Sequence, residues 1–248
     1  KLDMFTELAR YVDDILADPA GGISPLMHEF FSAVQDVADD PTSISARNNM
    51  INVATTLAAG FENMDNRFEQ LEQNTGKDIR LVVEEINKLV EDIGEVNVAI
   101  NKLKFGGGSQ QASDLLDLRE QLILELSQKI DISVLNEDAG TMSIFVGNGQ
   151  TIVNGSNVTL LGTVPNSADP TQDLIVYKGL TAAVDLSASL RGGGELGALL
   201  DFRDQLLKDT RNDLGRVAIA LAETFNTQHN SGMDLNGNLG SDFFSVGS

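Results

Sequence analysis

Apolar residues recur every three or four positions through the first hundred residues, and this spacing predicts helices. The first run spans Leu2 to Ile15 and stops at the breaker Asp18-Pro-Ala-Gly-Gly22. A second helix is expected next, with Ser24 as its cap and Pro25 at its first helical position. Its expected apolar face contains Met27, Phe30, Phe31, Val34 and Val37, and it should end by Pro41.

A much longer apolar stripe begins at Met50 and continues almost to Lys104. Steps of three and four residues alternate along it, except for two consecutive steps of four around Thr75 and Gly76. That exception is the pattern of a stutter in a coiled-coil stripe. One helix from near Ser45 to near Lys104 would contain about 60 residues and be about 90 Å long. The alternative is two ordinary helices joined near Gly76 and packed as a hairpin or bundle.

A nine-residue segment occurs twice, at residues 115–123 and 199–207, with six identities. Each copy follows a glycine triplet and is expected to begin a helix, which Ser113 would cap in the first case. Both copies should lay the same apolar face on the long helix. The stripe that starts in the second copy contains Leu199, Phe202, Leu206, Leu214, Val217, Leu221 and Phe225, and its helix should end between residues 226 and 232.

Between Ile130 and Leu186 the apolar spacing changes from that of helices to that of strands. Short runs contain Ile132 and Val134; Met142, Ile144 and Val146; Ile152 and Val153; Val158 and Leu160; and Leu174 and Val176. Gly147-Asn-Gly149 and Asn154-Gly155 are hairpin signals between these runs. We therefore expect a small antiparallel β insert of four to six strands, with residues 165–170 as a polar loop.

These elements predict an α+β chain, an elongated bundle of long helices with a small antiparallel β insert. Residues 1–130 and 190–232 would form a helical rod domain, and residues 131–189 would form the insert within it. Residues 233–248 would begin an outer domain or linker.

Composition narrows the class of protein. The chain has 248 residues and 42% hydrophobic content, enough to bury a core. Its 37 acidic and 17 basic residues give a net charge of −20, which repels phosphate backbones and anionic lipids, so neither nucleic acid nor membrane is an expected partner. Without cysteine, disulfides and thiolate metal sites are excluded. The chain shows no spanning segment and no signal-peptide pattern, and it is interpreted as an internal piece of a longer protein.

Two motifs have a chemical interpretation, but each matches its pattern only in part. Residues 192–197 fit G-x-G-x-x-G and open a helix, yet no βαβ unit surrounds them, so a flexible turn before a helix is expected. Asp234, Asn236 and Asn238 occupy the first, third and fifth positions of a calcium loop. Leu239 stands where that loop requires glycine, which favours a polar turn.

The remaining candidates do not form a catalytic array. His28 and His229 are far apart in sequence, and Asn154 and Asn157 match glycosylation acceptors, of which the first also fits a turn. We therefore predict no enzyme activity and no catalytic, cofactor-binding or metal-binding residues.

The two repeat copies share a basic residue, Arg119 in the first and Arg203 in the second. Each guanidinium matches a carboxylate on a neighbouring helix. The favoured interpretation is nevertheless a solvated arginine whose stem covers apolar surface.

Several segments, in order along nearly the whole chain, carry a family resemblance. They are residues 17–25, 28–34, 40–41, 47, 114–122, 194–203, 213–218, 225–229, 234–237 and 242–244. They resemble the flagellar hook-associated protein 1 family, and Gly194-Glu-Leu-Gly-Ala-Leu-Leu-Asp-Phe-Arg203 is the most specific match. The family's terminal polymerising segments find no match here.

This resemblance implies a structural adaptor of the bacterial flagellum, one that joins hook to filament as a layer at the hook tip. It implies an extracellular protein, exported through the flagellar type III channel without a cleaved signal peptide. The implied partners of the full-length protein are its own copies, the hook protein, the second junction protein and an export chaperone. The alternatives are an extracellular binding module or adhesin, and another flagellar junction or cap protein.

Overall fold

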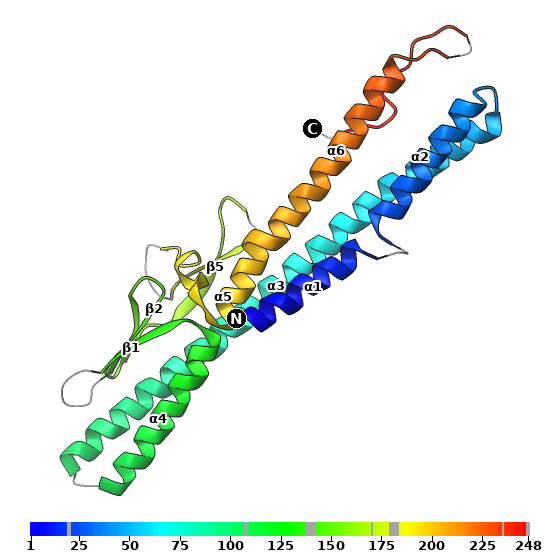
Figure 1. Cartoon of the computed structure of the whole chain (residues 1–248). Helices are drawn as coiled ribbons and strands as arrows, with labels where there is room; N and C mark the ends of the chain where they lie inside the picture. The colour runs from blue at the N-terminus through cyan, green and yellow to red at the C-terminus, as the bar shows by residue number, and fades with distance from the viewer. Residues whose placement is uncertain are drawn as a thin grey trace. The chain divides into compact units, whose positions relative to one another are not determined.

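A computed structural model describes residues 1–18, 21–106, 109–136, 142–169, 171–178, 184–234 and 236–246. Helices dominate these residues, and the strands fall between residues 132 and 177 (Figure 1). The predicted α+β class, with long helices and a small antiparallel sheet, is confirmed. The chain forms two compact units: unit 1 contains Lys1–Arg10 and Leu71–Gln205, and unit 2 contains Tyr11–Gln70 and Leu206–Ser248.

The long apolar stripe forms one uninterrupted helix, α3 (Ile44–Gly106), of 63 residues. The alternative of two helices joined near Gly76 is therefore wrong. Thr75 is buried and its hydroxyl donates to the carbonyl of Leu71 at 2.8 Å, within the helix. A helical glycine costs about 1 kcal/mol relative to alanine. The side chains of Phe68 and Ile79, on either side, are fully buried, and this burial outweighs the cost.

Two helix starts differ from their predictions, and α1 (Leu2–Leu16) precedes both. Helix α2 (Ile23–Asp39) is capped by Gly22 rather than Ser24, because Gly22 adopts the extended backbone that a cap requires. Helix α4 (Ser109–Lys129) begins one turn before Ser113. The intervening Gln110, Gln111 and Ala112 are favourable in helices, so the helix extends back through them.

The strands of unit 1 form two antiparallel sheets. The first contains, in order, β1 (Ile132–Asn136), β2 (Met142–Val146), β3 (Gln150–Asn154) and β4 (Asn157–Val158). The second pairs β5 (Leu161–Pro165) with β6 (Asp173–Tyr177). Both predicted hairpin signals lie at turns, where Gly147, Gly149 and Gly155 have positive φ angles. The strand β5 lies wholly outside the predicted runs, beginning just after Leu160.

The core of unit 1 lies between the strands and the helices. Ile79, Ile86 and Ile93 of α3 pack in one cluster with Leu126 of α4 and with residues of β2 and β3, among them Ile144. Figure 1 shows α4 lying beside the C-terminal part of α3. The same apolar stripe that predicts the long helix therefore also supports the β insert.

The second helical run of the sequence is not one regular α-helix. It contains α5 (Gly194–Asp201), a π-helical segment η3 (Phe202–Leu207) and α6 (Lys208–Asn230). A π segment widens the helix and turns the following residues relative to the preceding ones. The predicted single stripe is also wrong at Val217, which is 45% exposed.

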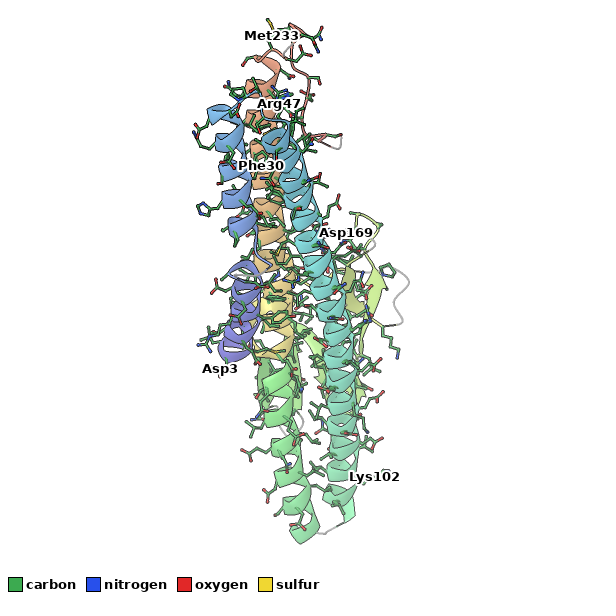
Figure 2. The ribbon with its side chains drawn as sticks, turned by 90° about the vertical axis from the view of Figure 1, so that its right-hand side faces the viewer. Asp3, Phe30, Arg47, Lys102, Asp169 and Met233 are labelled. Carbon is green, nitrogen blue, oxygen red and sulfur yellow. The ribbon has the colours of Figure 1, made fainter. Side chains whose placement is uncertain are left out.

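Aromatic side chains hold together one end of unit 2. Phe30 of α2 is fully buried, and its ring centroid lies 5.1 Å from that of Phe225 of α6 and 5.6 Å from that of Phe244. Figure 2 places Phe30 near the same end of this unit as Arg47 and Met233. Asn226 is buried beside the cluster, and its amide oxygen accepts hydrogen bonds from the backbone N–H groups of Phe243 and Phe244, both at 2.8 Å. This amide fixes the final described segment to α6.

Two glycines of α3 give a matched test of how the insert packs. At Gly76 an added Cβ would meet no atom closer than Arg80 Nη1 at 3.9 Å, whereas at Gly94 it would lie 2.7 Å from Cγ1 of Val158 in β4. We expect Gly76→Ala to stabilise the protein by about 0.5–1 kcal/mol. Gly94→Ala should destabilise it, because the Val158 side chain would have to shift away from the added methyl group. Urea unfolding followed by circular dichroism would measure both, and two changes of the same sign would contradict this packing.

Candidate functional sites: buried anchors and an apolar groove

The glycines of residues 192–197 serve close packing in unit 1. An added Cβ at Gly192 would lie 2.6 Å from the Asp131 carboxylate, and one at Gly197 would lie 2.9 Å from the Arg191 carbonyl oxygen. Gly194 has a φ of 69° and abuts the backbone of Ile130. Residues 192–197 run from the end of a 3-10 helix (Ser189–Gly192) into α5, so they begin a helix, as predicted.

The calcium-like residues also form a turn, in unit 2. The Asp234 carboxylate accepts hydrogen bonds from the backbone N–H groups of Asn236 and Asn238 and from the Asn238 side chain, at 2.8 to 2.9 Å. These bonds, with that from the Asn238 side chain largest, lower the pKa of Asp234. Within the described ranges, no group of three His, Cys, Asp or Glu residues is placed to hold a metal ion, and no helix has the length and apolarity of a membrane span.

The other weak candidates have structural surroundings. His28 is exposed on α2. Nδ1 of His229 lies 2.6 Å from the Ser241 carbonyl oxygen, and its ring stacks on Phe225. Asn154 ends β3 and Asn157 starts β4, on either side of the turn at Gly155.

Arg203 is buried, and the prediction of a solvated arginine is wrong for it. Its side chain is 3% exposed, Nε donates to the Asp204 carboxylate at 2.6 Å, and Nη1 donates to the Asp173 carbonyl at 3.1 Å. Arg191 donates to the other Asp204 oxygen at 2.6 Å. Because β6 covers this part of the helix, Arg203 is shielded from water. Arg203 therefore anchors the strand instead of facing solvent.

Asp204 balances this buried charge. Burial by itself raises the pKa of its carboxyl group, but the hydrogen bonds from Arg203 and Arg191 outweigh that effect and lower the pKa. The carboxylate therefore stays ionised in the folded protein. Arg203 donates both to this carboxylate and to a backbone carbonyl of β6. These two bonds fix the position and the direction of β6 relative to the helix.

Arg119, the equivalent residue of the first repeat copy, is also buried, so the solvated interpretation is wrong there too. Its Nη1 donates to Oδ1 of Asn97 at 3.1 Å, and Nδ2 of Asn97 donates to the Gly155 carbonyl at 2.7 Å. Burial lowers the pKa of Arg119. The chain of bonds links α4 through α3 to the turn between β3 and β4.

A second amide of α3 holds the other sheet. Nδ2 of Asn87 donates to the Leu161 carbonyl and Oδ1 of Asn87 accepts from the Leu161 N–H group, both at 2.8 Å. Arg80 pairs with Asp173 at 2.5 Å. Polar residues of α3 thus hold β5 and β6, while the apolar stripe packs beneath them.

The repeat copies differ in their apolar positions. Leu116 and Leu118 of the first copy are 42% and 43% exposed, whereas their counterparts Leu200 and Phe202 are fully buried. The prediction that both copies bury the same apolar face is therefore wrong. What they share is the buried arginine.

An apolar groove of about 240 Å³ lies between α3 and α6 in unit 2. Its walls contain Leu57, Phe61, Ala218, Ile219, Phe244 and Val246. Two of the lining residues, Ile219 and Val246, are 46% and 43% exposed. A wider recess of about 890 Å³ lies at the aromatic end of the same unit, lined in part by Met50, Ile51 and Met233.

Comparison with known proteins identifies the family. Residues 9–244 match the family model described as flagellar hook-associated protein FlgK helical domain. The chain belongs to the FlgK helical-domain family.

Relatives of the FlgK family match almost the whole chain. It is 36% identical over 238 residues to flagellar hook-associated protein 1 of Salmonella typhimurium, and 35% identical over 245 residues to that of Escherichia coli. These matches cover 96% of this chain, but 43% and 45% of the relatives. The solved structure of the flagellar hook junction protein FlgK from Burkholderia pseudomallei has a TM-score of 0.84 and 30% identity, covering 98% of this chain and 44% of that one. The chain thus spans less than half the length of these FlgK relatives.

Sequence reasoning missed the amide anchors and the groove. Asn97 lies within the apolar stripe of α3, between Ile93 and Ile100, and a buried asparagine at such a position needs a partner. The hydrogen bonds of Asn97 could therefore have been expected from the sequence. The groove has no such signal, because Ile219 and Val246 look like core residues until their exposure is known.

Arg203→Met tests the anchor on β6. We expect a loss of about 3 kcal/mol in the free energy of unfolding, because the Asp204 carboxylate, only 15% exposed, would lose one of its two cations. Arg203→Met/Asp204→Leu should recover part of that loss. The control is Gln205→Met, at the exposed neighbouring position. Urea unfolding would measure all four proteins, and an equal effect of Arg203→Met and Gln205→Met would refute the anchor.

The lowered pKa of Asp204 predicts acid sensitivity. A group whose pKa falls on folding stabilises the protein above its unfolded pKa, about 3.8 here, and this contribution is lost as the pH falls through the folded value. Asp204→Asn should therefore be less stable than the parent at pH 7, and the gap should shrink below about pH 4. The exposed Asp209→Asn on α6 is the control. A gap that stays constant with pH would contradict the assignment.

Proposed function

We propose that this chain is part of a structural adaptor of the bacterial flagellum, which joins the hook to the filament by assembling as a layer at the hook tip. The main support is the FlgK helical-domain match over residues 9–244. The names of the relatives, flagellar hook-associated protein 1, and of the solved hook junction protein from Burkholderia pseudomallei agree with it. The protein is then extracellular, exported without a cleaved signal peptide, and not an enzyme.

The architecture suits such a role. A layer in a filament transmits load between neighbours, and long helices with buried charged anchors provide stiffness without cofactors. We propose residues 1–130 and 190–232 as the helical rod, residues 131–189 as its insert, and residues 233–248 as the start of an outer domain or linker. The partners of the full-length protein are further copies of itself, the hook protein, the second junction protein and an export chaperone.

Deleting the gene of the full-length protein tests the proposal. We expect cells with hooks but no attached filaments, and unassembled filament protein in the medium, because the hook tip would lack its adaptor. Electron microscopy of purified hooks and swimming in soft agar would measure this. Complementation with the intact gene should restore filaments. Attached filaments in the deletion strain, or normal motility with loss of adhesion to a surface, would contradict the adaptor role.

A further inference from the structure

The two repeat copies adopt different kinds of helix. Residues 115–123 lie within the regular α-helix α4, whereas residues 199–207 end α5 and continue from Phe202 as the π-helical segment η3. Six of the nine positions are identical. Leucine, arginine and glutamine make up most of both copies, and all three favour the α-helix. Since π-helices are rare, the π register of the second copy comes from its surroundings rather than from its own sequence.

The π register places three consecutive side chains on the covered side of the helix. Phe202 is fully buried, Arg203 is 3% exposed and the Asp204 side chain is 15% exposed. In the first copy Arg119 is buried, but the residues on both sides of it are exposed. A π turn contains more residues than an α turn, so neighbouring side chains point in more similar directions. In the α register they are about 100° apart, which would turn at least one of the three toward solvent.

Hydrogen bonds from outside the segment hold this register. Arg203 donates to the Asp173 carbonyl of β6 at 3.1 Å. Arg191, in the 3-10 helix before α5, donates to the Asp204 carboxylate at 2.6 Å. Each bond requires its side chain to face a fixed partner, so both bonds are weakened when the segment turns. These bonds therefore stabilise the π register against the α register that the residues themselves favour.

We propose that η3 is a two-register switch whose state is set by β6. While Arg203 and Asp204 keep their partners, residues 202–207 are π-helical; when those bonds break, the segment takes the α register of the first copy. The change turns the residues after Leu207 about the helix axis by about 100°, the angle of one residue. A displacement of β6 is thereby converted into a rotation of the helix that follows. The inference goes beyond the proposed function and does not rest on it.

NMR couplings across hydrogen bonds identify the donor and the acceptor of each backbone bond, and so report the register directly. We expect i→i+5 bonds over residues 202–207 in the parent and i→i+4 bonds in Arg203→Met/Asp204→Leu, which lacks both anchors. The control Arg216→Met/Asp213→Leu removes an exposed ion pair of α6 by the same two changes and should keep the i→i+5 bonds. Retained i→i+5 bonds in the anchor variant, or their loss in the control, would overturn the proposal.

A conservative variant serves if the anchor variant loses its helical circular dichroism. Arg203→Lys keeps the charge but lacks the planar fork that reaches Asp204 and the Asp173 carbonyl together. We expect it to give a second set of signals with i→i+4 bonds. A single set with i→i+5 bonds in Arg203→Lys would mean that the arginine does not hold the register.

A matched pair of deletions tests whether η3 contains one residue more than an α-helix needs. Deleting Gln205 should force the α register and leave the following residues in phase, so the urea midpoint should fall no further than in Arg203→Met. Deleting Gln121, the same position of the first copy, turns the buried Leu126 and Ile130 of α4 away from the core. Its midpoint should fall much further, and equal falls would contradict the extra residue.

Hydrogen exchange in the Gln205 deletion tests the link to β6. Forcing the α register breaks the bond from Arg203 to the Asp173 carbonyl, so the amides of residues 173–177 should exchange about tenfold faster than in the parent. Strand β2 belongs to the other sheet and should exchange as before. Unchanged exchange in β6, or an equal increase in β2, would show that the register of η3 and the strand are not coupled.

Discussion

The burial of one face of β2 and β3 against the apolar stripe of α3 is the contact on which unit 1 depends. Neither partner could bury this surface alone, since a short hairpin is marginally stable in water and a helix is supported mainly by packing. Ile86 and Ile93 are fully buried from the helix side, and Ile144 and Ile152 are buried from the strand side. The long helix and the insert are therefore one folding unit in this region, although they are separate elements in the sequence.

Apolar packing alone does not set the register of a sheet on a helix, because it has no direction. The buried hydrogen bonds supply that direction. Asn97 and Asn87 reach the backbone of the two sheets at separate points, and Arg203 reaches β6 from another helix. Each anchor bonds to a backbone carbonyl of a strand or turn, and every amino acid has such a carbonyl. These contacts therefore restrict which amino acid can stand on the helix more than which can stand on the strand.

The long helix and the hairpin turns could be predicted because their signals are local and repeated. The apolar stripe of α3 continues over many turns, so one glycine could not break it, and Gly155 after Asn154 requires the positive φ that it adopts. The burial of the repeat arginines could not be predicted. Nearly identical nine-residue segments leave Leu118 half exposed in one place and bury Phe202 completely in the other. This difference comes from the segments that pack over each copy, which the sequence of the copy itself does not specify. The π-helical segment that begins at Phe202 could not be predicted for the same reason.

The paired hydrogen bonds between Asn87 and Leu161 make the helix side chain behave like one residue of a neighbouring strand. Strand β5 already pairs with β6 along its other side, so at Leu161 both edges of the strand are occupied. An open strand edge invites pairing with another chain, above all where many copies are crowded together. At Leu161 the Asn87 amide takes up the backbone N–H and C=O groups through which another strand would pair.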